Sequence, residues 1–402
     1  MKALTTSLLA PFIQELSALD SDDAMTSEWA AGLSIMRLVD AWRMGEPLSA
    51  WGFRQAQLLV RELSDESRVK VPLGKILETV EQGDRARSSR QVARALWRYA
   101  RMLELASSWG AAIEVYRMVL LVSDPDDEFR RTRCAIRIAF CVRWSNRLSE
   151  ALAHYRIAER LARACRDLEG VVWARCGRVS VLLGKGNVPL AARVADRTNA
   201  IAERYDVDRV RSRAYHSAAT IAYLRNEFET SLSLGHNALV LTRNPREKER
   251  ILCDIGAAMV GLHMFEQARR IFDMLAATAH QQTTRWGAML YLLEIESYSG
   301  TADELLRYER MILASRVPPA QRAMALVNLG EAYQRMGRDE IAREYLQQGL
   351  ALAVEHGVSW FVIQAEKALS GRTPKTISVP PATADANEMA WKIQELASSG
   401  SK

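Results

Sequence analysis

The chain has 402 residues, of which 49% are hydrophobic and 25% are charged, and its formal net charge is +6. This composition is that of an ordinary folded protein, and the length allows two domains or one extended repeat array. No run of eighteen apolar residues occurs, which excludes a transmembrane helix. Polar residues and Pro11 interrupt the first apolar run, and the five cysteines are an odd number. We therefore expect reduced thiols and a cytoplasmic location.

Helical periodicity begins at the start of the chain. Apolar residues recur at helical spacing over residues 3–19, from Trp29 to Trp42, over about 50–63 and in a short run around 76–80. These segments do not fit the repeat that follows. We expect residues 1–88 to form an N-terminal helical cap, because an end repeat with a bare apolar face would aggregate. A DNA-binding helix-turn-helix is the alternative, but no pair of helices here matches its short turn cleanly.

Residues 89–369 repeat one pattern, two helices joined by a tight turn. The clearest copy runs from Ala320 to Gly357, with helical spacing on both sides of a turn at Gly337. The small residues Gly330 and Ala342 fall where the two helices must cross. Counting back from Ala342, comparable packing positions recur every 37 to 40 residues, at Leu305, Ala268, Ser231, Ala191, Ala151 and Ala112.

This pattern resembles a tetratricopeptide repeat (TPR) in the step from Gly330 to Tyr333, in the turn residue Gly337 and in the packing residue Ala342. The resemblance implies an all-α fold, a right-handed α-solenoid of about seven helix-turn-helix repeats with a concave groove. The period exceeds the family's usual value of about 34 residues, so we expect longer helices. We also expect two extra residues in the third turn, at 184–187.

The repeats are expected to end near Ser370. Residues 370–386 combine Thr, Ser and Ala with three prolines, a composition that predicts a flexible linker. Residues 387–402 then predict a short amphipathic helix or tail, with one apolar face formed by Met389, Ile393 and Leu396. Two hypotheses stay open for this segment. It is either a frayed tail or a helix docked on the last repeat, or it occupies the concave groove.

Positive charge is concentrated in residues 130–213, which hold 18 Arg and one Lys against eight Asp and Glu, a local charge of +11. Arg also recurs eighteen residues before the packing position in four repeats, a place that faces the groove in similar repeats. This register gives ten candidate groove residues: Arg94, Trp97, Arg101, Arg133, Arg143, Arg178, Arg213, His216, Tyr223 and Arg250. Guanidinium groups beside aromatic rings suit the carboxylates of an acidic peptide or the phosphates of nucleic acid. A solvated helix face is the alternative explanation.

The sequence offers no pattern for catalysis. Its six histidines are scattered singly, none in a His-x-x-x-His spacing, and no phosphate-binding loop is present. We predict no catalytic, cofactor-binding or metal-binding residues.

We expect a non-catalytic protein-protein interaction scaffold that binds a peptide or protein segment, acidic by the arginine register, without cofactor or membrane. The alternative is a regulator associated with nucleic acid through residues 130–213. The oligomeric state stays open.

Overall fold

The computed structural model describes residues 4–17, 24–82, 85–299, 302–315, 317, 319–371 and 382–398. Within these residues every regular element is an α-helix, so the all-α prediction is confirmed. None of the helices described is both long enough and apolar enough to span a membrane. The chain divides into two compact units, Met1–Ala174 and Arg175–Lys402.

The first unit opens with four helices in the places that the periodicity predicts. They are α1 (Leu4–Ser17), α2 (Ala24–Met44), α3 (Ala50–Glu62) and α4 (Lys70–Glu81). They pack on a pair formed by α5 (Arg85–Leu105) and α6 (Trp109–Val122), with α1 and α2 against α6 and α4 against α5. Phe12 joins these layers, because its ring meets Trp29 edge-on at 5.7 Å and lies 6.5 Å from Tyr99. The pair α7 (Glu128–Trp144) and α8 (Leu148–Ala164) follows, and α9 (Leu168–Gly184) begins in this unit.

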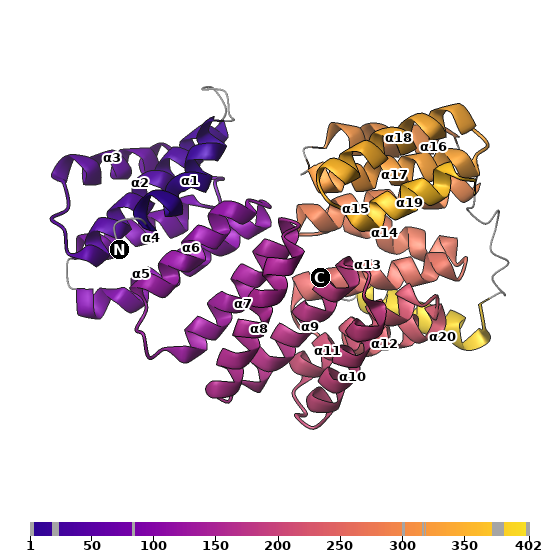
Figure 1. The fold of residues 1–402 in the computed structure, drawn as a ribbon, viewed down its shortest axis with the longest axis horizontal. Coiled ribbons are helices and arrows are strands. Elements are labelled where there is room, and N and C mark those ends of the chain that lie inside the picture. The colour runs from indigo at the N-terminus through magenta and orange to yellow at the C-terminus, as the bar shows by residue number, and fades with distance from the viewer. Residues whose placement is uncertain are drawn as a thin grey trace. The chain divides into compact units, whose positions relative to one another are not determined.

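The second unit continues the alternation of first and second helices (Figure 1). Its helices are α10 (Val188–Glu203), α11 (Asp208–Leu224), α12 (Phe228–Leu241), α13 (Pro245–Gly261), α14 (Phe265–Thr278), α15 (Gln282–Ser299), α16 (Ala302–Ala314), α17 (Pro319–Arg335), α18 (Asp339–Glu355) and α19 (Ser359–Leu369). The odd-numbered helices from α11 to α19 each contact the next odd-numbered one. These first helices therefore form one continuous face of the unit.

The predicted packing register is present throughout. The packing positions from Ala112 to Ala342 each lie in the second helix of a pair, and none is more than 2% exposed. The turns keep the same register. Five residues before the packing position, the middle residue of a three-residue turn has φ between 59° and 73°, at Ser107, Asn146, Gly186, Asn226, His263 and Gly337.

The third turn is no longer than the others. Helix α9 continues through Gly184, and the connection to α10 consists of residues 185–187, so the prediction of two extra residues was wrong. The longer period lies in the helices instead, many of which have 17 residues.

Gly330 lies at the crossing of α17 and α18. A Cβ atom on this glycine would lie 2.5 Å from Leu346 Cγ and 3.0 Å from the carbonyl oxygen of Ala342. Real Cβ atoms do not approach other atoms as closely as 2.5 Å, so the two helices can meet here because residue 330 has no side chain. This confirms that Gly330 and Ala342 lie at the helix contact.

The C-terminal segment forms helix α20 (Ala384–Ser398). Most of the predicted linker lies outside the described residues, which omit 372–381. Helix α20 packs on α12 and α14, beside which it lies in Figure 1. Its buried face consists of Ala386, Ala390, Ile393 and Ala397. Lys248 Nζ of α13 donates a 2.5 Å hydrogen bond to the backbone oxygen of Leu396. The helix is thus docked on second helices, not on the last repeat, and the hypothesis that it occupies the groove was wrong.

Candidate functional site

All ten predicted groove residues lie on first helices. Helix α5 carries Arg94, Trp97 and Arg101, α7 carries Arg133 and Arg143, α9 carries Arg178, α11 carries Arg213, His216 and Tyr223, and α13 carries Arg250. The structure brings Arg213 and Arg250 together around one carboxylate. The others lie in separate clusters, several of which already contain acidic side chains.

Arg101 belongs to a buried cluster around Glu104, whose side chain is 4% exposed. Arg101 Nη1 and Arg137 Nη2 pair with Glu104 Oε2. Arg137 Nε and the hydroxyl of Tyr116 each donate a 2.7 Å hydrogen bond to Oε1. Arg101 and Arg137 therefore share one carboxylate within the unit. A buried carboxylate with two guanidinium partners is a structural element, because removing it would leave buried charge unpaired.

Arg133 spans two helix pairs. Its Nη2 lies 3.1 Å from Glu169 Oε2 and 3.4 Å from the Asp167 carboxylate, both at the start of α9. Its guanidinium also lies over Phe129, 4.7 Å from the ring centroid, and 5.8 Å from that of Trp173. The face of this unit combines arginines with aromatic rings elsewhere too: Arg143 over Phe140 and Trp144, and Trp97 edge-on to Tyr116.

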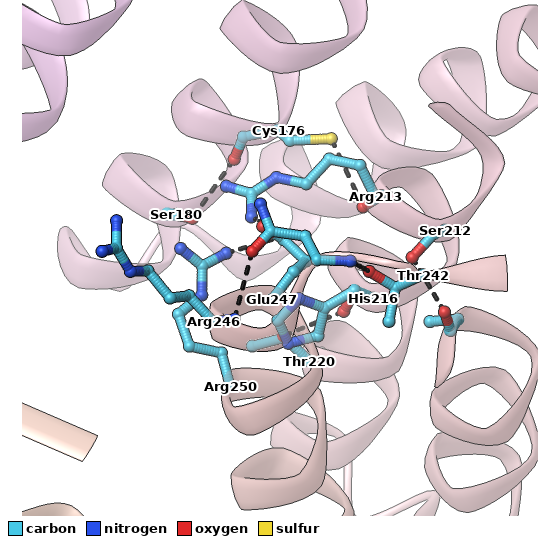
Figure 2. Close-up of polar contacts among 12 residues, drawn as sticks. Cys176, Ser180, Ser212, Arg213, His216, Thr220, Thr242, Arg246, Glu247 and Arg250 are labelled. Atoms are coloured by element: carbon cyan, nitrogen blue, oxygen red, sulfur yellow. Dashed lines mark hydrogen bonds and ion pairs between the residues drawn. The ribbon is translucent and has the colours of Figure 1, made fainter. Parts of the chain in front are cut away.

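In the second unit, Glu247 of α13 accepts hydrogen bonds from two predicted groove arginines (Figure 2). Arg213 Nη1 lies 2.5 Å and Arg250 Nη2 lies 2.9 Å from Glu247 Oε1. Burial opposes ionisation of Glu247, but Arg250 and Arg213 outweigh it and hold the pKa of this carboxyl far below its usual value. The two guanidinium groups thus share one carboxylate of the chain.

His216 is 8% exposed and pairs with a carboxylate of the next first helix. Its Nε2 lies 2.9 Å from Asp254 Oδ2, and Thr220 Oγ1 donates to the same oxygen at 3.1 Å. Burial raises the pKa of Asp254. The hydrogen bond and charge of His216 and the hydrogen bond from Thr220 lower this pKa by more, so the net shift is downward. The polar contact between α11 and α13 thus continues along the face.

Sequence reasoning missed the groups on α15 and α17. Arg335 Nη2 lies 3.6 Å from Glu294 Oε1 and 4.0 Å from Glu331 Oε2, while its Nη1 donates to Ser297 Oγ at 3.1 Å. Its guanidinium lies 4.9 Å from the centroid of the Tyr298 ring. Both distances to the carboxylates exceed those of a close ion pair. A polar cluster with incompletely paired carboxylates therefore lies on this face.

Helix α19 extends the cluster, because Gln364 Nε2 donates to Glu331 Oε2 at 3.0 Å. Burial raises the pKa of Glu294, an effect that Arg335 opposes and Glu331 reinforces. Burial likewise raises the pKa of Glu331. A recurrence could have identified these residues: Glu294 and Glu331 each lie eleven residues before a packing position, and Tyr298 and Arg335 each lie seven before one.

No protein-family model matches the sequence, and no curated protein matches it. The fold is similar to that of a Rap protein complexed with competence and sporulation factor, with a TM-score of 0.55 and 11% identity over 82% of this chain and 99% of that one. It is also similar to the Rap conjugation gene regulator of plasmid pLS20 in complex with the Phr* peptide, with a TM-score of 0.57 and 11% identity over 82% of this chain and 96% of that one.

The chain has the tetratricopeptide-repeat fold. In TPR terms, the clusters described above lie on the first helices, whereas the core packing positions lie on the second.

The described residues can be searched for two kinds of reactive site, a metal site and an activated nucleophile. No group of three or more His, Cys, Asp and Glu side chains among the described residues is placed to hold a metal ion. Burial raises the pKa of the Cys134 thiol to about 12, which makes it a poor nucleophile. The Thr220 hydroxyl beside His216 has two acceptors for its one hydrogen, Asp254 Oδ2 and the backbone oxygen of His216, each at 3.1 Å. Thr220 does not present its hydroxyl to the imidazole ring as an activated nucleophile would.

Proposed function

We propose that the protein binds a peptide or protein segment along the first-helix faces of its TPR array, and that it acts by binding rather than by catalysis. The observation that carries this proposal is that first and second helices carry different kinds of side chain. Second helices supply the buried packing positions, whereas first helices carry partly exposed polar and aromatic groups from one pair to the next. A face of this kind offers directional contacts to an extended ligand.

The similar solved structures support the class of ligand. One is a complex with competence and sporulation factor and the other a complex with the Phr* peptide. At 11% identity this likeness concerns the fold, so the ligand of this chain must be argued from its own residues.

An acidic ligand is the narrower form of the proposal, and it rests on the arginines in the groove register. Four of the seven candidate arginines, Arg101, Arg133, Arg213 and Arg250, already meet carboxylates of the chain. An acidic ligand would have to compete with those ion pairs. The exposed Arg94 on α5 forms no ion pair with a carboxylate of the described residues.

Nucleic acid is the weaker candidate. Part of the positive charge of residues 130–213 is compensated by ion pairs, among them Arg147 with Glu150, Arg163 with Glu159 and Arg211 with Asp206 and Asp208. Binding through phosphates depends on the number of free cationic side chains. We therefore favour a polypeptide ligand.

A display library of random twelve-residue peptides, selected against the full chain, tests the proposal. Each selected peptide is then measured against first-helix variants Arg94→Ala, Tyr298→Ala and Glu331→Gln, and against the second-helix controls Arg193→Ala and Arg270→Ala. We expect at least one first-helix variant to weaken each peptide about tenfold, a loss of about 1.4 kcal/mol, with the controls unchanged. A library that yields no binder, or peptides that respond only to the second-helix controls, would refute it.

A further inference from the structure

Helix α5 carries a row of three exposed arginines, Arg90, Arg94 and Arg98. They are four residues apart, so all three lie on one side of the helix, about 6 Å from one another along its axis. No ion pair or hydrogen bond of these side chains occurs within the part of the chain that the structure describes. The row also shares its side of α5 with Trp97 and Arg101, two of the predicted groove residues.

The repeat register explains why the middle arginine of the row, Arg94, is unpaired among the described residues. Arg133 is the counterpart of Arg94, since each lies eighteen residues before its packing position. Arg133 meets Asp167 and Glu169, which lie 24 and 22 residues before Ala191. The corresponding places before Ala151 are held by Asp127 and Phe129.

Neither of those two residues neutralises Arg94. Asp127 caps α7 by accepting from the backbone N–H of Arg130 at 2.9 Å, and it pairs with the Arg130 side chain at 3.3 Å. Phe129 carries no charge and lies against Arg133. The first pair thus lacks the acidic partners that the second pair has, while it retains the arginines.

Like charges four residues apart destabilise a helix, so an uncompensated row is a local cost of the fold. A ligand with carboxylates would remove that cost. We propose that Arg90, Arg94 and Arg98 form the binding surface for an acidic segment of a protein partner. In an extended segment, alternate side chains are about 6.4–6.8 Å apart on one side, close to the spacing of the row. A guanidinium group binds a carboxylate through two parallel hydrogen bonds.

The surroundings favour a polypeptide over single-stranded nucleic acid, which needs aromatic rings free to stack on bases. Trp97 is the aromatic residue beside the row, and its ring is engaged edge-on with Tyr116 at 5.1 Å. The Trp97 side chain is partly buried, and the ring of Phe129, which holds the register position opposite Arg94, lies under the Arg133 guanidinium at 4.7 Å. This inference rests on the proposed function, of which it names the partner's chemistry.

The test uses the full chain and two labelled probes, a twelve-residue peptide of alternating Glu and Ser and the oligonucleotide dT12, at low and moderate salt. The variant carries Arg90→Glu, Arg94→Glu and Arg98→Glu. The control carries Arg156→Glu, Arg160→Glu and Arg343→Glu, three exposed arginines of second helices. Both variants change the net charge by the same amount, and circular dichroism confirms that each is folded.

We expect the peptide to lose at least tenfold in affinity for the first variant and less than twofold for the control. Equal losses in both variants would reduce the effect to net charge and overturn the inference. If dT12 bound more tightly than the peptide and lost affinity in the same variant, the surface would be assigned to nucleic acid and the inference would be overturned as well. If library-selected peptides bind first helices but the acidic probe ignores the row, this inference fails while the proposed function stands.

Discussion

Replacing Gly330 by Ala tests the packing register at the contact between α17 and α18. The new Cβ atom would lie 2.5 Å from Leu346 Cγ, a branch point inside the core, and 3.0 Å from a backbone oxygen. Neither neighbour is the free end of a flexible side chain. Overpacking of this kind costs about 1–3 kcal/mol, whereas the higher helix propensity of Ala returns about 1 kcal/mol. We expect a net destabilisation of up to about 2 kcal/mol.

Gly287→Ala provides the matched control. Gly287 lies inside α15, and a Cβ atom there would meet nothing within 4 Å. In this variant the gain in helix propensity is not opposed by overpacking, so we expect a stabilisation of about 1 kcal/mol. The difference between the two variants isolates the overpacking cost.

Urea denaturation followed by circular dichroism measures both variants. Amide hydrogen exchange in α17 and α18 resolves the local effect, because repeat arrays can unfold in parts. If Gly330→Ala proved as stable as Gly287→Ala, the helix contact would not be where we place it.

Four further predictions concern charge and docking. Arginines lower the pKa of Glu247, so its contribution to stability is complete above its ordinary value of 4.5 and is lost as the pH falls toward the lowered pKa; Glu247→Gln should destabilise at pH 7 and only slightly less at pH 4, because most of the loss falls at still lower pH. Burial raises the pKa of Glu294, so Glu294→Gln should have the opposite sign and stabilise at pH 7, and urea denaturation at both pH values decides. Glu104→Gln should cost about 3–5 kcal/mol, because it leaves buried guanidinium charge uncompensated, and a melting temperature close to that of the parent would contradict the cluster. Ile393→Ala in α20 should cost about 2–5 kcal/mol in local hydrogen exchange, whereas the 59% exposed Trp391 should tolerate Ala with little change.

The fold was predictable because its signal repeats. One hairpin with Ala342 at its centre would be weak evidence, but six further small or apolar residues recur at nearly constant spacing, and each proves buried. The turns were less predictable. Gly186 marks one turn as Gly337 marks another, yet Ser107 and His263 adopt the same left-handed conformation without a glycine. Here the packing of two helices imposes a backbone geometry that local preference would not select.

The candidate site was predictable only in part, for a reason that Arg133 illustrates. Its place on a first helix follows from the register, but its partners Asp167 and Glu169 lie more than thirty residues away, at the start of the next repeat. Whether an arginine at this repeat position is free or paired with a carboxylate therefore depends on the next repeat. Arg94 and Arg133 look alike in the sequence, and the difference between Phe129 and Glu169 separates them.

The docking of α20 shows a second limit. Helical periodicity identified an apolar face through Met389, Ile393 and Leu396, and Ile393 is indeed buried completely. Met389 and Leu396 are partly buried against the same core, and three buried alanines, Ala386, Ala390 and Ala397, complete the contact. Small side chains let a helix approach its neighbours closely. They therefore determine where α20 fits, although they add little to the apolar character of its sequence. Helices α12 and α14, on which α20 packs, are second helices far away in the chain. Periodicity can therefore predict that the C-terminal helix has a partner face, while the choice of partner follows from shape.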